Sequence, residues 1–259
     1  MKKILLILLV FYSVNSWSQS IVLITGSNRG IGYGLVKEFA DNGWKVIATC
    51  RKPENADDLK TLAANNSNII LEKLDVTDYK NVEALAEKLK GQKIDVLINN
   101  AGLLPIGEWN KPFQEMDFEY AREVFDVNSF APVKMMQAFM NHIAASEQKK
   151  IINISSQAGS FANNNHEPRR YVYRASKASL NMFTFDIAYE LGKMGITAIA
   201  LHPGTVHTQS GQTFEEAQQQ FSGLIRIEDS AAMIYQTIAG LNPTDNGKFF
   251  SYEGHELSW

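Results

Sequence analysis

Short apolar runs alternate with longer amphipathic stretches over most of this chain. The short runs are rich in Ile, Val and Leu, which is typical of strands that are buried on both faces. In the longer stretches, apolar residues recur at the spacing of one face of a helix. The pattern predicts strands at residues 21–25, 45–49, 68–74, 94–98, 150–155, 197–201 and 248–250, and its clearest helices at residues 30–42, 78–90 and 173–191.

This alternation indicates an α/β fold, because strands joined by helices form a parallel sheet that is covered on both faces. We expect a single-domain, Rossmann-like, doubly wound parallel sheet of about seven strands over residues 19–259. In such sheets, ligands bind beyond the carboxyl ends of the strands. With 259 residues, 45% of them hydrophobic, the chain is long enough to bury a substantial core.

The first residues have a different character. Lys2 and Lys3 precede an apolar run at residues 4–12, and small polar residues follow as far as Ser20. This order is typical of a secretory signal peptide, and the run is short for a membrane span. We therefore expect residues 1–18 to be a signal peptide or an uncleaved anchor, and the protein to be exported or periplasmic. A mis-assigned start and a cytoplasmic location are the alternative; membrane contact is expected only through an uncleaved segment.

Charge and cysteine content exclude several classes of protein. The net charge of -3 gives no basic field for nucleic acid, so no nucleic-acid partner is expected. The five histidines lack the spacing of zinc ligands, and no metal site is expected. A single cysteine, Cys50, allows no intrachain disulfide.

One pair of residues suggests acid–base chemistry. Tyr173 and Lys177 are four residues apart in a predicted helix, so they share one face. A unit charge about 4 Å from the phenol, at an effective dielectric of about 20, is worth roughly 4 kcal/mol, or about three pKa units. We expect Lys177 to lower the pKa of Tyr173 in this way. A tyrosine tuned toward neutral pH suits the reduction of a carbonyl or the oxidation of an alcohol, although such pairs also occur on ordinary surface helices.

A glycine-rich turn follows the first predicted strand. The chain there reads Thr25-Gly26-Ser27-Asn28-Arg29-Gly30-Ile31-Gly32, and a helical pattern begins at once. Gly30 and Gly32 would let the backbone N–H groups of the helix N-terminus approach a pyrophosphate without interference from a Cβ atom. The spacing differs from the G-x-G-x-x-G fingerprint, and glycines also serve as plain turn residues.

Together, these motifs resemble the short-chain dehydrogenase/reductase family from Ile21 to Trp259. The segment from Tyr173 to Asn181 and the ending at residues 248–259 look like the branch named for the C-factor and sniffer carbonyl reductases. The resemblance implies a homodimer or homotetramer, formed through the helices that start near Gly107 and Tyr173. Further landmarks fall in the family's order: Leu74-Asp75-Val76, Asn99-Asn100-Ala101-Gly102, Asn128, Ile154-Ser155-Ser156 and His202-Pro203-Gly204.

The resemblance also assigns roles to residues. Tyr173 would be the acid, and Lys177 would also bind the nicotinamide ribose. Ser156 would hold the substrate oxygen, because the family's serine is usually the second of such a pair, after Ser155. Asn128 would hold a water in the proton relay. The implied cofactor-binding residues are Gly26, Asn28, Arg29, Gly30, Ile31, Gly32, Arg51, Asp75, Val76, Asn100, Ala101, Gly102, Tyr173, Lys177, Pro203, Gly204 and Val206.

The choice of cofactor depends on charge. After the second predicted strand comes Arg51, and no carboxylate stands there to bind ribose hydroxyls. Arg51 and Arg29 match the basic pair with which family members prefer NADP, since guanidinium groups hold phosphate in a forked geometry. NADP(H) is therefore expected over NAD(H), the alternative being that both arginines are solvated surface charges. Asp75 would contact adenine or serve as a turn residue.

These observations predict an NADP(H)-dependent oxidoreductase that transfers hydride between nicotinamide and a small-molecule carbonyl or alcohol. The alternative is an exported, C-factor-like signalling or interaction protein, or a cofactor-binding sensor, that retains the dinucleotide-binding fold. The substrate and the direction of reaction stay open. Residues 103–109, 163–170 and 205–221 are expected to line the pocket, and the last of these segments is either a lid or an ordinary surface loop.

Overall fold

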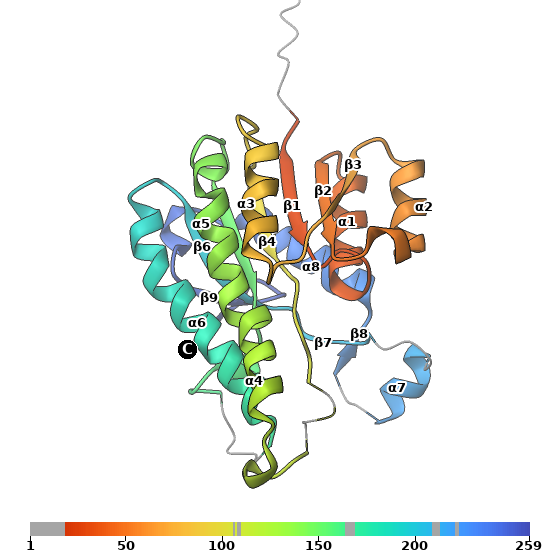
Figure 1. Ribbon diagram of the computed structural model, residues 1–259, viewed down its shortest axis with the longest axis vertical. Coiled ribbons are helices and arrows are strands. Elements are labelled where there is room, and N and C mark those ends of the chain that lie inside the picture. Colours follow the sequence, from red (N-terminus) through yellow and green to blue (C-terminus); the bar gives the residue numbers. More distant parts are fainter. Residues whose placement is uncertain (1–18, 106, 108–109, 164–168, 209–212, 221–222) are drawn as a thin grey trace, which may run out of the picture.

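The computed structural model describes residues 19–105, 107, 110–163, 169–208, 213–220 and 223–259. Its main sheet has eight strands in the order β10-β9-β6-β5-β4-β1-β2-β3 (Figure 1). All neighbouring strands in it run parallel except β9 and β10. The strands are β1 (Ile21–Thr25), β2 (Lys45–Cys50), β3 (Ile69–Lys73), β4 (Val96–Asn99), β5 (Lys150–Ile154), β6 (Thr197–His202), β9 (Phe249–Ser251) and β10 (Glu256–Leu257).

Helices cover both faces of this sheet. Helices α1 and α8 pack side by side and share one apolar core with α2, whereas α3, α5 and α6 contribute to a second core on the other face. The α-helices are α1 (Gly30–Asp41), α2 (Asp57–Asn65), α3 (Tyr79–Lys88), α4 (Phe118–Phe125), α5 (Ala131–Ala144), α6 (Tyr171–Gly192), α7 (Phe214–Gln220) and α8 (Ile227–Gly240). Short helical turns are η1 (Pro53–Asn55), η3 (Phe113–Glu115), η4 (Asp126–Phe130), η5 (Gln157–Gly159) and η6 (Pro243–Asp245).

The doubly wound α/β architecture is therefore confirmed, and every expected strand and helix named above lies within two residues of its predicted bounds. The main sheet holds eight strands, one more than the approximate number expected. The additional strand, β10, is a two-residue antiparallel partner of β9 and is too short to show a periodicity. Strands β7 (Thr205–Val206) and β8 (Leu224–Ile225) form a separate two-stranded sheet.

The register of the parallel strands brings their carboxyl ends to one edge. Thr25 pairs with Thr49, Asn99 with Asn153, and Ile154 with Leu201. The glycine turn, Arg51, the loop after β4, the serine pair and Pro203 all follow these strand ends. The fold thus gathers at a single edge the motifs that the sequence separates by more than a hundred residues.

Within the described residues, no helix combines the length and the apolar character that a membrane span requires. The segment interpreted as a signal peptide or anchor, residues 1–18, lies outside the described residues. Export therefore stays a prediction.

Candidate active site

The glycine turn is held against the loop that follows β4 by contacts that leave no room for side chains. A Cβ atom on Gly26, whose φ is 68°, would lie 2.8 Å from Cα of Ala101. A Cβ atom on Gly32 would lie 2.3 Å from the carbonyl oxygen of Gly26 and 2.5 Å from Nδ2 of Asn100. Because the closest neighbour of this Cβ atom is a backbone oxygen, no residue with a side chain fits at position 32 without moving the backbone.

Two polar side chains clamp this turn. Nδ2 of Asn100 donates to the carbonyls of Thr25 and Gly26, at 2.9 and 3.1 Å. Oγ1 of Thr25 in turn accepts from the backbone N–H groups of Asn100 and Ala101, both at 3.0 Å. The side chain of Asn100, predicted to bind cofactor, therefore shapes the cradle, and Thr25 has the same role.

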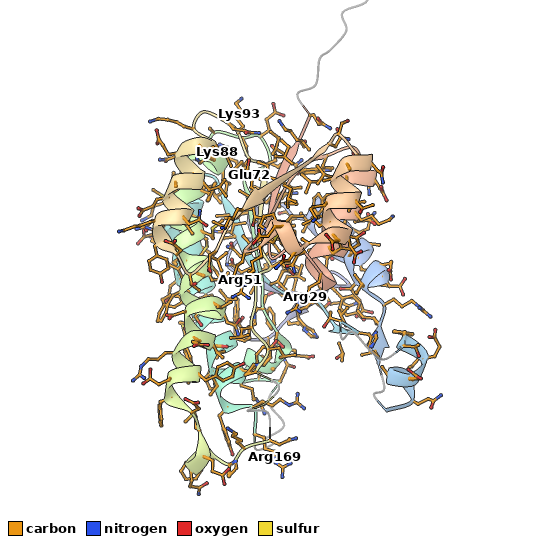
Figure 2. All side chains as sticks on the ribbon, turned by 45° about the vertical axis from the view of Figure 1, so that its right-hand side comes forward. Arg29, Arg51, Glu72, Lys88, Lys93 and Arg169 are labelled. Carbon is orange, nitrogen blue, oxygen red and sulfur yellow. The ribbon has the colours of Figure 1, made fainter. Side chains whose placement is uncertain are left out.

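The basic pair lies beyond the ends of β1 and β2. Arg29 and Arg51 are both exposed, and neither forms an ion pair with another described residue. Figure 2 shows both at the edge of the sheet formed by the carboxyl ends of the strands. Two guanidinium groups are thus available to an anionic ligand beside the glycine turn.

Asp75 has a local structural role. Its Oδ1 accepts from the N–H and the hydroxyl of Thr77, at 3.0 and 2.7 Å, and its own N–H donates to Asn81. This geometry is an Asx turn after β3, the turn role that the sequence left open. Contact of Asp75 with adenine stays a prediction.

Other predicted cofactor residues contribute to the core or to turns. Ile31 packs against the core beneath α1 and α8, and Val76 and Ala101 pack in the core on the opposite face. Pro203 is buried, and its carbonyl accepts a hydrogen bond from Ser230 at 2.7 Å. Among the other predicted cofactor residues, Asn28 and Gly102 are exposed, and Gly204 and Val206 are half-buried.

Ser156, Tyr173 and Lys177 meet where η5 packs on α6. Oγ of Ser156 accepts from the N–H of Ala158 at 3.2 Å, and the Ser156 side chain also forms a hydrogen bond with Tyr173. Lys177 is buried, and its Nζ donates to the carbonyl of Ile154, at the end of β5, at 2.8 Å. Burial lowers the pKa of Lys177 to about 8.

The expected lowering of the Tyr173 pKa is wrong, because the pKa is raised. Burial raises the pKa of Tyr173, and the Ser156 hydrogen bond and the charge of Arg170 offset this only in part. The ammonium group of Lys177 is directed at the Ile154 carbonyl. Tyr173 is therefore protonated at neutral pH, which is the form that a proton donor needs.

Asn128 lies in the π-helical turn η4, between α4 and α5, and is fully buried. Its amide oxygen accepts from the N–H of Leu103 at 2.7 Å. Its Nδ2 donates to the carbonyl of Leu103 at 2.9 Å and to the hydroxyl of Ser176 at 3.1 Å. Asn128 therefore joins the loop after β4 to α6. The predicted role in holding a relay water stays a prediction.

Comparison with known proteins identifies the family. A model described as short chain dehydrogenase matches residues 20–219. The chain belongs to the short-chain dehydrogenase family. This is a family of oxidoreductases, and membership confirms the resemblance inferred from the glycine turn and the Tyr173–Lys177 pair.

Two solved structures and one curated protein show the similarity. The NADPH-bound carbonyl reductase from chicken fatty liver is 33% identical, with a TM-score of 0.83 over 93% of this chain and 94% of that one. The carbonyl reductase Sniffer of D. melanogaster is 30% identical, also with a TM-score of 0.83, over 93% of this chain and 100% of that one. The C-signal protein of Myxococcus xanthus is 30% identical over 69% of this chain and all of its own length.

Two further contacts of this short-chain dehydrogenase escaped the sequence analysis. A Cβ atom on Gly159 would lie 2.6 Å from the carbonyl carbon of Lys177, so only glycine lets η5 pack this closely on α6. Ser155 is buried, and its hydroxyl donates to Oδ1 of Asn181 on α6. The two serines thus differ, since Ser155 holds the helix and Ser156 bonds Tyr173. The sequence offers two weak signals for these contacts, a glycine after the serine pair and a polar residue at a buried position of α6.

The predicted pocket segments are described only in part. Residues 106, 108–109, 164–168, 209–212 and 221 lie outside the described residues, so pocket wall and lid stay predictions. Within the described part, a Cβ atom on Gly30 would lie 3.2 Å from Cγ2 of Thr208, which places the residues after β7 over the glycine turn. The ring of His207 packs edge-on against Phe214 of α7.

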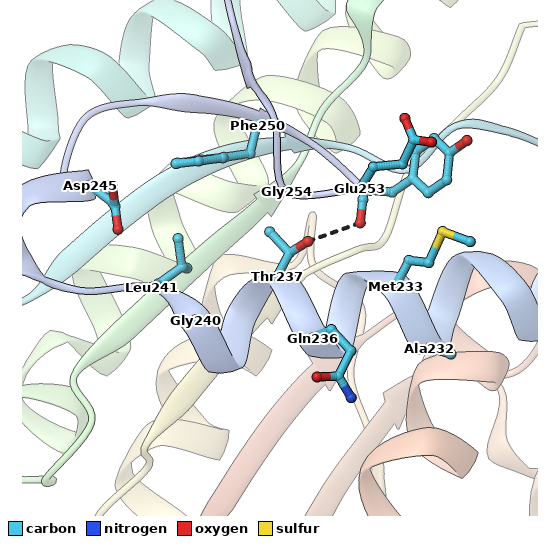
Figure 3. Close-up of a pocket in the computed structure, with 11 residues that line it drawn as sticks. Ala232, Met233, Gln236, Thr237, Gly240, Leu241, Asp245, Phe250, Glu253 and Gly254 are labelled. Atoms are coloured by element: carbon cyan, nitrogen blue, oxygen red, sulfur yellow. Dashed lines mark hydrogen bonds between the residues drawn. The ribbon is translucent and has the colours of Figure 1, made fainter.

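A groove of about 720 Å³ lies on another part of the surface, between α8 and the β9–β10 hairpin (Figure 3). Met233, Gln236, Phe250 and Glu253 line it, and Thr237 donates to the carbonyl of Tyr252 at 2.9 Å. It contains none of the residues predicted to act in catalysis. Among the described residues, no group of three or more His, Cys, Asp or Glu side chains is arranged to hold a metal ion.

Proposed function

We propose that this protein is an NADP(H)-dependent reductase of a small-molecule carbonyl, which also catalyses the reverse oxidation of the alcohol. The observation that carries the proposal is the protonated Tyr173, hydrogen-bonded to Ser156 and one helical turn from the buried Lys177. These groups lie at the same edge of the sheet as the glycine cradle. When bound, the nicotinamide supplies the hydride.

The residues of the chain would supply the remaining functions. Ser156 would hold the carbonyl oxygen of the substrate, and Tyr173 would donate its hydroxyl proton to that oxygen as charge develops on it. The Lys177 ammonium group, at the end of β5, would hold the nicotinamide ribose. Asn128 would fix the loop after β4 relative to α6 while this transfer occurs.

The cradle fits a dinucleotide phosphate. Gly26 and Gly32 let the turn at the N-terminus of α1 pack against the loop after β4 more closely than any Cβ atom would allow, and backbone N–H groups at a helix N-terminus bind phosphate. Arg29 and Arg51 stand exposed beside it and suit the 2′-phosphate that distinguishes NADP from NAD. The NADPH bound to the chicken carbonyl reductase, a relative at 33% identity, supports the same choice.

The deciding experiment titrates the purified protein, without residues 1–18, with NADPH and with NADH, and then measures turnover against a panel of aldehydes, ketones and quinones. Tyr173→Phe should lower kcat by about 100-fold to 10,000-fold and leave the Kd for NADPH unchanged. Tyr171→Phe, an exposed tyrosine on the same helix, is the matched control and should retain wild-type turnover. Arg51→Ala should weaken NADPH binding but not NADH binding, and Lys60→Ala on α2 should affect neither.

If neither NADPH nor NADH binds, the result would contradict both the proposed reductase function and the alternative of a cofactor-binding sensor. It would favour an exported signalling or interaction protein, a role supported by the 30% identity to the whole of C-signal. Cell fractionation and N-terminal sequencing would test the export that we propose for residues 1–18. Recovery of intact residues 1–18 in the cytoplasm would contradict it.

We also propose that the protein self-associates through α6 and α4, which pack against each other; α4 is the helix that follows Gly107 in the chain, and it begins at Phe118. Large apolar side chains on these helices are more than half exposed, and such patches mark interaction sites. They are Phe118, Met182, Phe185 and Tyr189. Light scattering should give the molar mass of a dimer or tetramer, and Tyr189→Asp should lower it. A monomeric wild type would contradict the proposal.

A further inference from the structure

Ser258 and Trp259 lie against the segment that follows the serine pair. The hydroxyl of Ser160 donates to the carbonyl of Ser258 at 2.8 Å, and Nδ2 of Asn163 donates to the same carbonyl at 3.2 Å. The N–H of Ala162 donates to the carbonyl of Trp259 at 3.0 Å. Three hydrogen bonds thus join residues that are nearly a hundred positions apart in the sequence.

The indole of Trp259 anchors this contact to the rest of the fold. It stacks on Phe249 of β9, with ring centroids 5.3 Å apart and an interplanar angle of 16°. It also meets Phe185 of α6 edge-on, at 5.9 Å and 75°. Phe249 is fully buried, so one neighbour of the indole belongs to the core and the other to the helix that carries Tyr173.

The contact continues to Ser156 through a short, hydrogen-bonded turn. Ser160 is buried and directly follows η5, whose three residues separate it from Ser156. Within the turn, the N–H of Gly159 donates to the carbonyl of Ser156 at 2.9 Å. On its other side, Gly159 packs so closely against the backbone of Lys177 that a Cβ atom would not fit between them. We therefore expect a displacement of Ser160 to reach Ser156, because the turn between them is short and Gly159 packs closely on Lys177.

We propose that Trp259 is a positioning residue for the substrate-binding serine. Its indole holds Ser258 in place, Ser258 holds Ser160, and Ser160 fixes Ser156 at hydrogen-bonding distance from Tyr173. The inference rests on the proposed reductase function and extends it to a part of the chain that touches neither the glycine cradle nor Arg51. Loss of the indole should thus impair carbonyl turnover and spare nucleotide binding.

The test compares Trp259→Ala with Trp259→Phe. Misplacement of a reacting group by about 1 Å costs on the order of 100-fold in rate, so Trp259→Ala should lower kcat for the carbonyl by at least about tenfold. The Kd for NADPH and the molar mass should not change. Trp259→Phe retains an aromatic stack and should recover most of the activity. Tyr79→Ala on α3, a partly exposed aromatic away from the site, is the control and should behave as wild type.

Ser160→Ala supplies a second, smaller change. It removes the donor to Ser258, and because it acts on the same chain of contacts, its effect on kcat should not add to that of Trp259→Ala. Full additivity, or equal losses of NADPH binding and turnover in Trp259→Ala, would overturn the proposal.

Amide exchange separates this inference from the proposed function. Trp259→Ala should speed hydrogen exchange at the N–H of Ala162, which is bonded to the Trp259 carbonyl. Unchanged exchange would overturn the contact itself. A wild type that binds NADPH but reduces no carbonyl would instead contradict the proposed function, while faster exchange at Ala162 in the variant would still show that Trp259 positions the segment.

Discussion

The cofactor cradle and the serine–tyrosine–lysine site lie at one edge of the sheet, but they are built in opposite ways. The cradle depends on missing side chains, since Gly26 and Gly32 let backbone segments approach more closely than any Cβ atom allows. The catalytic side depends on side chains that reach across the fold, such as Asn128 to Leu103 and Ser155 to Asn181. We therefore expect the first region to be most sensitive to added atoms and the second to removed ones, although Thr25 and Asn100 clamp the cradle and Gly159 packs closely on Lys177.

The largest effect is expected from an added methyl group in the cradle. In Gly32→Ala, the Cβ atom would lie 2.3 Å from the carbonyl oxygen of Gly26, and a backbone atom there cannot move aside cheaply. NADPH binding should fall by at least about 100-fold, with a loss of about 1–3 kcal/mol in the free energy of unfolding. Fluorescence titration and urea denaturation measure the two quantities.

Gly240→Ala is the matched control. A Cβ atom on Gly240, at the end of α8, would meet nothing within 4 Å. This variant should bind NADPH as wild type does and should be unchanged or slightly more stable, because alanine favours a helix. Equal losses in both variants would mean that the cradle is no more sensitive to added atoms than the rest of the fold.

A removed amide on the catalytic side should have the next largest effect. Asn128→Ala leaves the N–H and carbonyl of the half-buried Leu103 without their partner, and each unpaired group costs about 1–3 kcal/mol where water does not replace it. Urea denaturation should show a loss of about 4 kcal/mol. Asn141→Ala, at an exposed position on α5, should change stability by less than about 0.5 kcal/mol. A loss below about 1 kcal/mol for Asn128→Ala would contradict this account.

The same contrast explains what could be predicted from the sequence. The glycine turn is predictable because strand, turn and helix are consecutive in the sequence, although its contacts with Asn100 and Ala101 are not. The contacts of Gly159 with Lys177 and of Ser160 with Ser258 join distant parts of the chain, and no local pattern marks them. Strand β10 was missed because two residues show no periodicity.

The direction of the Tyr173 pKa shift does not follow from the sequence for a related reason. The spacing of Tyr173 and Lys177 correctly placed them one turn apart on α6, but spacing does not determine where a long side chain ends. The carbonyl of Ile154, on another element, receives the ammonium group of Lys177. Burial then dominates both pKa values, raising that of Tyr173 and lowering that of Lys177. The family resemblance is enough to predict which residues act, but their pKa values follow from burial in the fold.

The smallest expected effect is a pH dependence of stability that arises from Lys177. Its pKa is about 8 in the folded protein and near 10.5 in the unfolded chain, so between these values the unfolded chain binds more protons. The free energy of unfolding should therefore rise with pH in this window, by about 1 kcal/mol from pH 7 to 9. Lys177→Met, which cannot titrate, should lack this rise, while contributions from other groups such as Lys150 are common to both proteins and cancel in the difference. Parallel urea stability curves for wild type and Lys177→Met would show that the ammonium group is not desolvated in the fold, and that the catalytic side holds it in contact with water.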